Sequence, residues 1–214
     1  MYVKFSLLKI YLNLGDFMKF YHASDIADLK ELSPQQSSYI QNPTLFFSSK
    51  MENVLIYLAN PVKRFYEQKY GKSNQIFQKF ATYGFNKEKL LSIDEYYPNA
   101  LQENFGDAPG YIYEIEAEPN NLTENKIPYV YSTTEPQKVT NCTYIPNALD
   151  LVLDFEKKGL LKINRYETLS EKKLQIIKQQ IEDCFAKTDD KIFKEFLIEK
   201  FPNLNLGQNT TIKD

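Results

Sequence analysis

The chain has 214 residues, a formal net charge of −2, and 43% hydrophobic and 25% charged residues. These values are typical of one soluble, well-cored domain with room for a helical appendage, and the near-neutral charge disfavours sequence-independent nucleic-acid binding. The two cysteines, Cys142 and Cys184, are far apart in the sequence, which favours reduced thiols in a cytoplasmic protein. With only one histidine in the chain, we expect no metal site. The sequence has no run of roughly 20 apolar residues that could span a membrane.

Residues 1–17 are apolar but lack the pattern of a signal peptide. Lys9 and Asn13 break the apolar run, and no small-residue cleavage site follows. Gly15-Asp16 can be encoded by GGA-GAT, which resembles a ribosome-binding sequence just before the codon of Met18. We therefore expect translation to start at Met18 and residues 1–17 to be an upstream extension of the reading frame.

The first predicted strand carries the only histidine of the chain. An aromatic pair followed by turn formers predicts a strand over residues 19–23, with His22 near its end. Ser24 or Asp25 is expected to cap a helix that ends near Leu32, because apolar residues recur there at helical spacing. A histidine is by type more often an ordinary, partly buried residue, but a strand end can present it to a cleft.

The same plan of strand, cap and helix repeats about ten residues later. Residues 45–47 predict a second aromatic strand, two serines follow as the cap, and a helix carries Val54, Tyr57 and Leu58 on one side. A tyrosine on such an apolar helix face is usually a core residue.

The rest of the chain predicts further helices and strands. Helices are expected over residues 62–80 with a break at Gly71, 87–92 followed by a loop over 94–98, 148–158, 171–186 and 190–201. Strands are expected over residues 111–116, 129–132, 139–144 and 160–166. On the strand that follows the turn at Gly106–Gly110, alternation places Glu114 and Glu116 on the exposed face.

The predicted fold class is α+β, with short, mostly antiparallel strands and intervening helices. Residues 18–168 form the main domain in this prediction. Residues 169–206 form a C-terminal helical pair that packs on it, with Ser170 as the cap of the first helix and Thr188 or Asp189 as the cap of the second. Residues 207–214 are expected to be a disordered tail.

The order Tyr-His-x-Ser at residues 21–24, followed by Leu-Phe-Phe-Ser-Ser at 45–49 and a helix carrying Tyr57, resembles the NAD-binding core of ADP-ribosyltransferases. The similar class has a His-Tyr-Glu signature and includes diphtheria-type toxins and poly-ADP-ribose polymerases. The resemblance covers roughly residues 19–153. It implies an ADP-ribosyltransferase-like split of mostly antiparallel sheets, and a bacterial-type mono-ADP-ribosyltransferase that moves ADP-ribose from NAD+ to a protein or nucleic-acid acceptor.

The resemblance also implies roles for residues of the two strands and the second helix. His22 would hydrogen-bond the adenosine ribose, the backbone of Ala23 would meet the nicotinamide carboxamide, and Ser24 matches the hydroxyl residue that follows. Tyr57 would stack on the nicotinamide, where a cation over a tyrosine face gains about 0.5–2 kcal/mol. Phe46 occupies the position of the second sandwiching aromatic residue.

A carboxylate is the third group that the reaction needs. Cleavage of the nicotinamide–ribose bond passes through an oxocarbenium-like sugar, whose positive charge a carboxylate stabilises. In the family this residue stands just before a strand, and Glu135 stands before the strand expected at 139–144, so we choose it over Glu114 and Glu116. The alternative for Glu135 is a solvated loop residue.

Two departures from the family pattern leave a second function open. Ala23 replaces the usual glycine, and Val54 replaces a serine three residues before the tyrosine. A catalytically inactive binding protein on the same fold, such as a phage or mobile-element interaction protein, is therefore the alternative to a toxin with a cognate inhibitor. A related NAD-using transferase that processes RNA phosphates fits poorly because it needs several Arg and His residues. The sequence contains no G-x-G-x-x-G motif for dinucleotide binding, no P-loop and no Gly-x-Ser-x-Gly motif of serine hydrolases.

Overall fold

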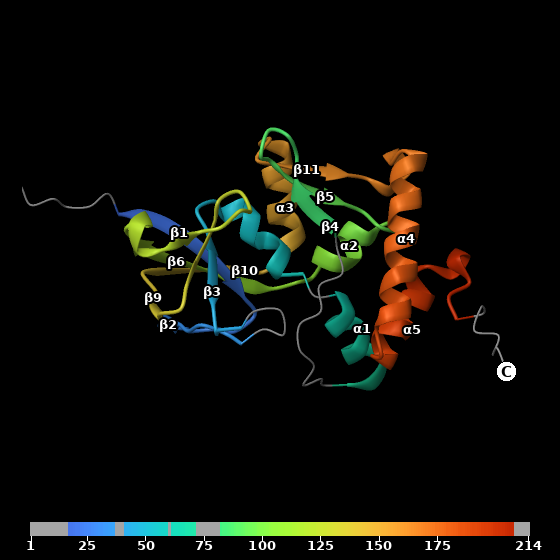
Figure 1. The fold of residues 1–214 in the computed structure, drawn as a ribbon, viewed down its shortest axis with the longest axis horizontal. Coiled ribbons are helices and arrows are strands. Elements are labelled where there is room, and N and C mark those ends of the chain that lie inside the picture. The colour runs from blue at the N-terminus through green and yellow to red at the C-terminus, as the bar shows by residue number, and fades with distance from the viewer. Residues whose placement is uncertain (1–16, 37–40, 60, 72–81, 208–214) are drawn as a thin grey trace, which may run out of the picture.

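The computed structural model describes residues 17–36, 41–59, 61–71 and 82–207, and it confirms an α+β protein with mostly antiparallel strands (Figure 1). The predicted upstream extension, apart from Phe17, lies outside the described residues. The same holds for residues 72–80 of the predicted helix over 62–80, and for residues 208–214 of the predicted tail.

A six-stranded antiparallel sheet forms the larger part of the fold. Its strands lie in the order β10, β6, β1, β3, β8, β7. Their bounds are β1 (Met18–Ser24), β3 (Leu45–Ser48), β6 (Gly110–Ala117), β7 (Thr123–Glu124), β8 (Val130–Thr133) and β10 (Asn141–Ile145). The central strand β1 pairs with β6 along its whole length, but with β3 only at Tyr21↔Ser48. The pairing of β1 with β3 therefore ends just before His22.

Two smaller sheets complete the strand content. One contains β11 (Leu161–Asn164), β5 (Leu91–Asp94) and β4 (Thr82–Phe85), and its β11–β5 pair is the parallel one. The other pairs β2 (Glu31–Leu32) with β9 (Gln137–Lys138). The strands expected over 19–23, 45–47, 111–116, 129–132, 139–144 and 160–166 are all confirmed to within a few residues.

The helix expected between Ser24 and Leu32 is wrong. The Ser24 hydroxyl accepts the Ile26 N–H at 3.1 Å in a local turn, Asp28 has a positive φ of 57°, and the chain then joins β9 as β2. The buried hydroxyl of Tyr113 donates to the Ile26 carbonyl at 2.6 Å and accepts the Leu29 N–H at 3.3 Å. These bonds occupy backbone groups that a helix would need, so tertiary contacts override the local spacing.

The helix expected over residues 87–92 is also wrong. The Asn86 side chain accepts the N–H groups of Glu88 and Leu90, and Lys89 has a φ of 58°, so the segment is the turn of a hairpin between β4 and β5. The loop expected over 94–98 is followed by a short helix, α2 (Ala100–Phe105), that the spacing does not predict.

The remaining helices follow the sequence closely. They are the 3-10 helix η1 (Met51–Tyr57), α1 (Pro61–Tyr70), α3 (Ala148–Lys157), α4 (Glu171–Lys187) and α5 (Lys191–Lys200), with short 3-10 turns η2 (Pro119–Asn121), η3 (Tyr166–Thr168) and η4 (Pro202–Leu204). Gly71 ends α1 with a φ of 82°, and Ser170 caps α4 as expected. The cap of α5 is Asp190 rather than Thr188 or Asp189, because its carboxylate accepts the N–H groups of Ile192 and Phe193.

The two faces of the large sheet bury different cores. Phe20 of β1 belongs to one core with Phe47, Tyr113 and Ile115. Ala23 belongs to the opposite core, in which residues of η1, α3, β5 and β11 pack on the sheet. A third cluster joins α1 to α4 and α5, so the C-terminal helices lie beside α1, away from the large sheet (Figure 1).

Candidate functional site

The imidazole of His22 has one of its two nitrogens occupied. Nδ1 lies 2.9 Å from the Phe46 carbonyl oxygen, and the ring meets the edge of Phe47 at a centroid distance of 6.2 Å. Burial lowers the pKa of His22 below its usual value, against the opposing effect of the Phe46 hydrogen bond, so the ring is neutral at pH 7. Because a carbonyl can only accept, Nδ1 carries the proton and Nε2 presents a lone pair.

That lone pair is available to a ligand. Within the described ranges, the Phe46 carbonyl is the hydrogen-bond partner of this ring, and Nε2 is not among the fully buried atoms that lack one. The bond also crosses the place where β1 and β3 cease to pair. The imidazole of His22 is thus held in place beside the point where the pairing of β1 with β3 ends.

Ala23 and Ser24 continue β1 along the same opening. Ala23 is 8% exposed and packs in the core below η1, while Ser24 is half-buried and its hydroxyl is engaged with the Ile26 N–H. Phe46, opposite them on β3, is half-buried. Strand alternation puts Ala23 on the η1 face of the sheet and His22 on the opposite face, so His22 and η1 lie on different sides of β1.

Tyr57 is the last residue of η1 and is not a core residue. It is 42% exposed, whereas Val54 and Leu58, expected on the same side, are 4% and 7% exposed. Burial raises the pKa of its hydroxyl, and the pKa of Tyr83 on β4 is raised by burial and by the neighbouring Tyr57. The Tyr57 hydroxyl therefore lies close enough to Tyr83 to influence its pKa.

Glu135 lies in the exposed turn between β8 and β9. Its N–H donates to the Thr133 hydroxyl at 3.0 Å, and its carbonyl accepts from the Gln137 side chain at 3.3 Å. Thr133 pairs with Leu45 at the start of β3. The turn therefore lies just outside the sheet, past the sheet end at which His22 stands. Among the described contacts, none joins the Glu135 carboxylate to His22 or Tyr57.

The expected exposure of Glu114 is wrong, whereas Glu116 is exposed as predicted. Glu114 is 7% exposed, and its two oxygens accept hydrogen bonds from Lys19 Nζ and Asn141 Nδ2, each at 3.0 Å. Burial alone would raise its pKa, but the hydrogen bonds from Lys19 and Asn141 and the Lys19 charge outweigh it and lower the pKa. Glu114 is buried although Glu116 is exposed, because Lys19 and Asn141 reach its carboxylate from the flanking strands β1 and β10.

Sequence reasoning passed over Glu52. This residue of η1 is 9% exposed, but its carboxylate oxygens are not among the fully buried polar atoms that lack a partner, so they reach solvent. The sequence feature that could have drawn attention to Glu52 is its place as the one charged residue of η1.

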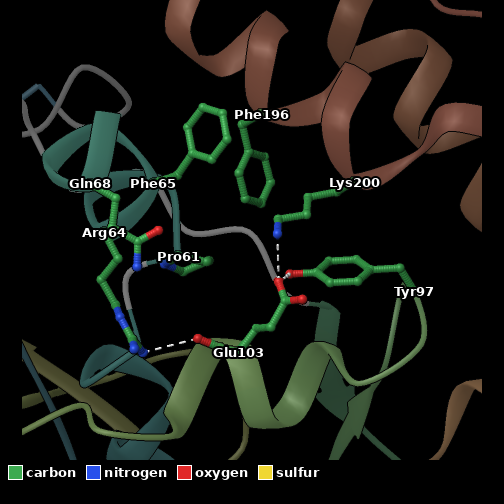
Figure 2. Close-up of a pocket in the computed structure, with 8 residues that line it drawn as sticks. All are labelled: Pro61, Arg64, Phe65, Gln68, Tyr97, Glu103, Phe196 and Lys200. Atoms are coloured by element: carbon green, nitrogen blue, oxygen red, sulfur yellow. Dashed lines mark hydrogen bonds and ion pairs between the residues drawn. The ribbon is translucent and has the colours of Figure 1, made fainter. Parts of the chain in front are cut away.

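A separate pocket of about 170 Å³ lies between α1, α2 and α5 (Figure 2). Arg64 Nη1 donates to the carbonyls of Glu103 and Gly106, and the Glu103 carboxylate accepts from Lys200 at 2.8 Å and from the Tyr97 hydroxyl at 3.1 Å. None of the predicted site residues lines this pocket. Glu103 pairs with Lys200 and Arg64 binds backbone carbonyls, so the pocket is a polar seam between α5 and the elements α1 and α2.

Other site types find no support in the described residues. Cys142 and Cys184 are free and exposed, and no group of three or more potential metal ligands comes together in the part of the chain that the structure describes. In the same part, no helix has both the length and the apolar character needed to cross a membrane.

No family model, no curated protein and no solved structure matches this chain. The geometry of the site itself must therefore support any assignment of function.

Proposed function

We propose that the chain binds NAD+ at the corner formed by β1, β3 and η1 and transfers its ADP-ribose to a macromolecular acceptor in the cytoplasm. The observation that carries this proposal is the His22 Nδ1–Phe46 carbonyl bond at 2.9 Å, which leaves Nε2 as a fixed hydroxyl acceptor where β1 and β3 part. The opening between these strands is consistent with the split sheet of an ADP-ribosyltransferase-like fold.

The groups around the opening match the two halves of NAD+. In this proposal Nε2 of His22 accepts a hydroxyl of the adenosine ribose, and the backbone of Ala23 together with Ser24 meets the nicotinamide carboxamide. Phe46 and the exposed ring of Tyr57 offer aromatic faces to the cationic nicotinamide. A rigid strand end and a packed 3-10 helix hold these groups, which lowers the entropy cost of orienting the dinucleotide.

The proposed reaction is a substitution at the anomeric carbon of the nicotinamide ribose. The bond to the nicotinamide nitrogen breaks and its electron pair leaves with nicotinamide, while a nucleophilic atom of the acceptor forms the new bond and releases its proton. Glu135 is the proposed carboxylate that orients the acceptor. Its exposed turn suits contact with a large partner better than contact with a buried sugar.

The first experiment compares the wild type with His22→Asn, His22→Ala and Glu135→Ala. The Asn side chain can still donate to the Phe46 carbonyl but offers nothing in place of Nε2, so His22→Asn separates folding from ligand contact. We expect label transfer from NAD+ in a cell lysate, and toxicity on expression, to fall by about 100-fold or more in the His22 variants. Equal behaviour of all four proteins would reject the proposal.

Val54 favours an inactive binding protein as the second candidate. This residue is 4% exposed, so it lies in the core and offers no hydroxyl to the carboxamide. NAD+ binding that depends on His22, without any label transfer or cleavage of NAD+, would select this candidate.

A further inference from the structure

The strand β10 forms one outer edge of the large sheet. Among the described strands it pairs with β6 alone, so every second N–H and C=O group along β10 points away from the sheet. Residues 141–144 are all exposed, and because side chains alternate between the two faces of a strand, neither face of β10 is covered there. The outer backbone groups of β10 can therefore pair with an added strand.

The two ends of β10 are held in place. The N–H and the hydroxyl of Thr140 both donate to the Glu114 carbonyl, at 2.9 and 3.1 Å. The Asn141 side chain donates to the Glu114 carboxylate at 3.0 Å, and Ile145 at the other end of the strand is buried. Because the edge is already formed, pairing with it costs less conformational entropy than pairing with a mobile segment.

The strand lacks the charged residues that usually protect an edge. Natural edge strands commonly carry charged side chains, which prevent pairing with another chain. The outer strands β7 and β11 follow this rule with the exposed Glu124 and Lys162. Residues 139–145, Val-Thr-Asn-Cys-Thr-Tyr-Ile, contain no charged residue. The contrast with β7 and β11 favours pairing at β10.

The sequence of β10 suits a second copy of the chain as its partner. In an antiparallel pair around a two-fold axis at Thr143, this residue meets Thr143 of the second copy, and Cys142 meets Tyr144. No like charges face each other, and a threonine pair is favourable in an antiparallel sheet. Tyr144 is 55% exposed and its ring lies 5.2 Å from that of Tyr111, so it is placed to pack against the added strand.

We infer that two copies of the chain associate through antiparallel pairing of their β10 strands around a two-fold axis at Thr143. The pairing continues the antiparallel order of the large sheet from one copy into the other. This inference does not depend on the proposed function. Two short paired strands bury less than the roughly 1,200 Å² of a stable interface, so the association is weak and depends on protein concentration.

Sedimentation equilibrium of the wild type tests whether the chain associates with itself. Over a range of about 5–500 µM, the weight-average mass should rise from 25.1 kDa toward twice this value, as for a complex of micromolar affinity. A mass that stays at 25.1 kDa at every concentration would overturn the inference.

Thr143→Lys tests the position of the axis. The residue is exposed, and the variant places two lysines opposite each other, so association should weaken by about tenfold or more. Mixing this variant with Thr143→Glu should restore association, because opposite charges then meet at the axis. Thr123→Lys is the matched control: it makes the same change at an exposed position of β7 and should associate like the wild type. A mixture that associates no better than either variant alone would place the contact elsewhere.

A disulfide at the axis gives an independent measurement. In a background of Cys142→Ser and Cys184→Ser, Thr143→Cys puts two thiols on residues whose Cα atoms lie about 4.5–5.5 Å apart in the paired strands, a distance that a disulfide can bridge. Oxidation by copper phenanthroline should convert this variant into a covalent dimer, whereas Thr123→Cys in the same background should stay monomeric. Equal dimer yields for the two variants would reject an axis at Thr143.

Discussion

At the scale of single residues, the hydrogen bonds of each buried polar group separate structural side chains from candidate site residues. Glu114 is buried and fully hydrogen-bonded, which is what a structural carboxylate requires. His22 has one ring nitrogen bonded to the Phe46 carbonyl. The sequence could suggest His22, because a strand end is a local feature. It could not separate the buried Glu114 from the exposed Glu135, because burial and hydrogen bonding are set by distant segments.

The pH dependence of stability tests the environment of His22. Burial lowers the pKa of the folded imidazole below the unfolded value of about 6.5, so the unfolded chain binds more protons between the two values. The His22 contribution to the free energy of unfolding is therefore fully present above about pH 6.5, and it falls as the pH drops toward the folded pKa. Urea unfolding of the wild type and His22→Asn at several pH values should give a difference that rises with pH and then levels off. A flat difference would contradict a buried, neutral imidazole.

At the scale of elements, local patterns predict the strands better than the segment that joins β1 to β3. Alternation and turn chemistry around Gly110 predict β6 from a few neighbouring residues. The helix expected before Leu32 fails because Tyr113, more than eighty positions away, binds backbone groups of that segment. The helix expected over 87–92 fails because one side chain, Asn86, captures two N–H groups. The spacing of apolar residues gives no sign of either of these side-chain hydrogen bonds, which compete with the helical ones.

Tyr113→Phe tests whether one hydroxyl holds the segment after β1 in its irregular conformation. The variant removes the hydroxyl that binds the Ile26 carbonyl and the Leu29 N–H. The Tyr113 side chain is fully buried. We expect a loss of about 1–3 kcal/mol in the free energy of unfolding and faster amide exchange at Leu29. Tyr144→Phe, at a 55% exposed position, should have no effect on either quantity. Unchanged exchange at Leu29 would show that other contacts hold the segment.

At the scale of the whole molecule, the C-terminal helices and the domain share a packed interface. The rings of Phe65 on α1 and Phe196 on α5 meet edge to face at 5.5 Å, and Phe196 is 1% exposed. The polar seam of Arg64, Glu103 and Lys200 lies beside this pair (Figure 2). The helical pair is therefore expected to unfold together with the sheet rather than as a separate unit.

Phe196→Ala tests this cooperativity. Removing a buried phenylalanine costs about 3–5 kcal/mol, and in a single cooperative unit the whole transition should shift by that amount. Far-ultraviolet circular dichroism and tyrosine fluorescence should report one coincident transition at lower denaturant. Two separated transitions, of which one keeps the wild-type midpoint, would show that the helices fold independently.

The nitrogen resonances of the single imidazole test directly whether His22 binds NAD+ through Nε2. The chain has one histidine, so ¹⁵N NMR of the labelled ring reports on His22 without ambiguity. In the free protein we predict a neutral ring at pH 7 with the proton on Nδ1. On addition of NAD+, the Nε2 signal should shift as its lone pair accepts a hydroxyl, while Nδ1 remains bonded to the Phe46 carbonyl. A proton on Nε2 in the free protein, or no change in the Nε2 signal at saturating NAD+, would rule out the proposed role of His22.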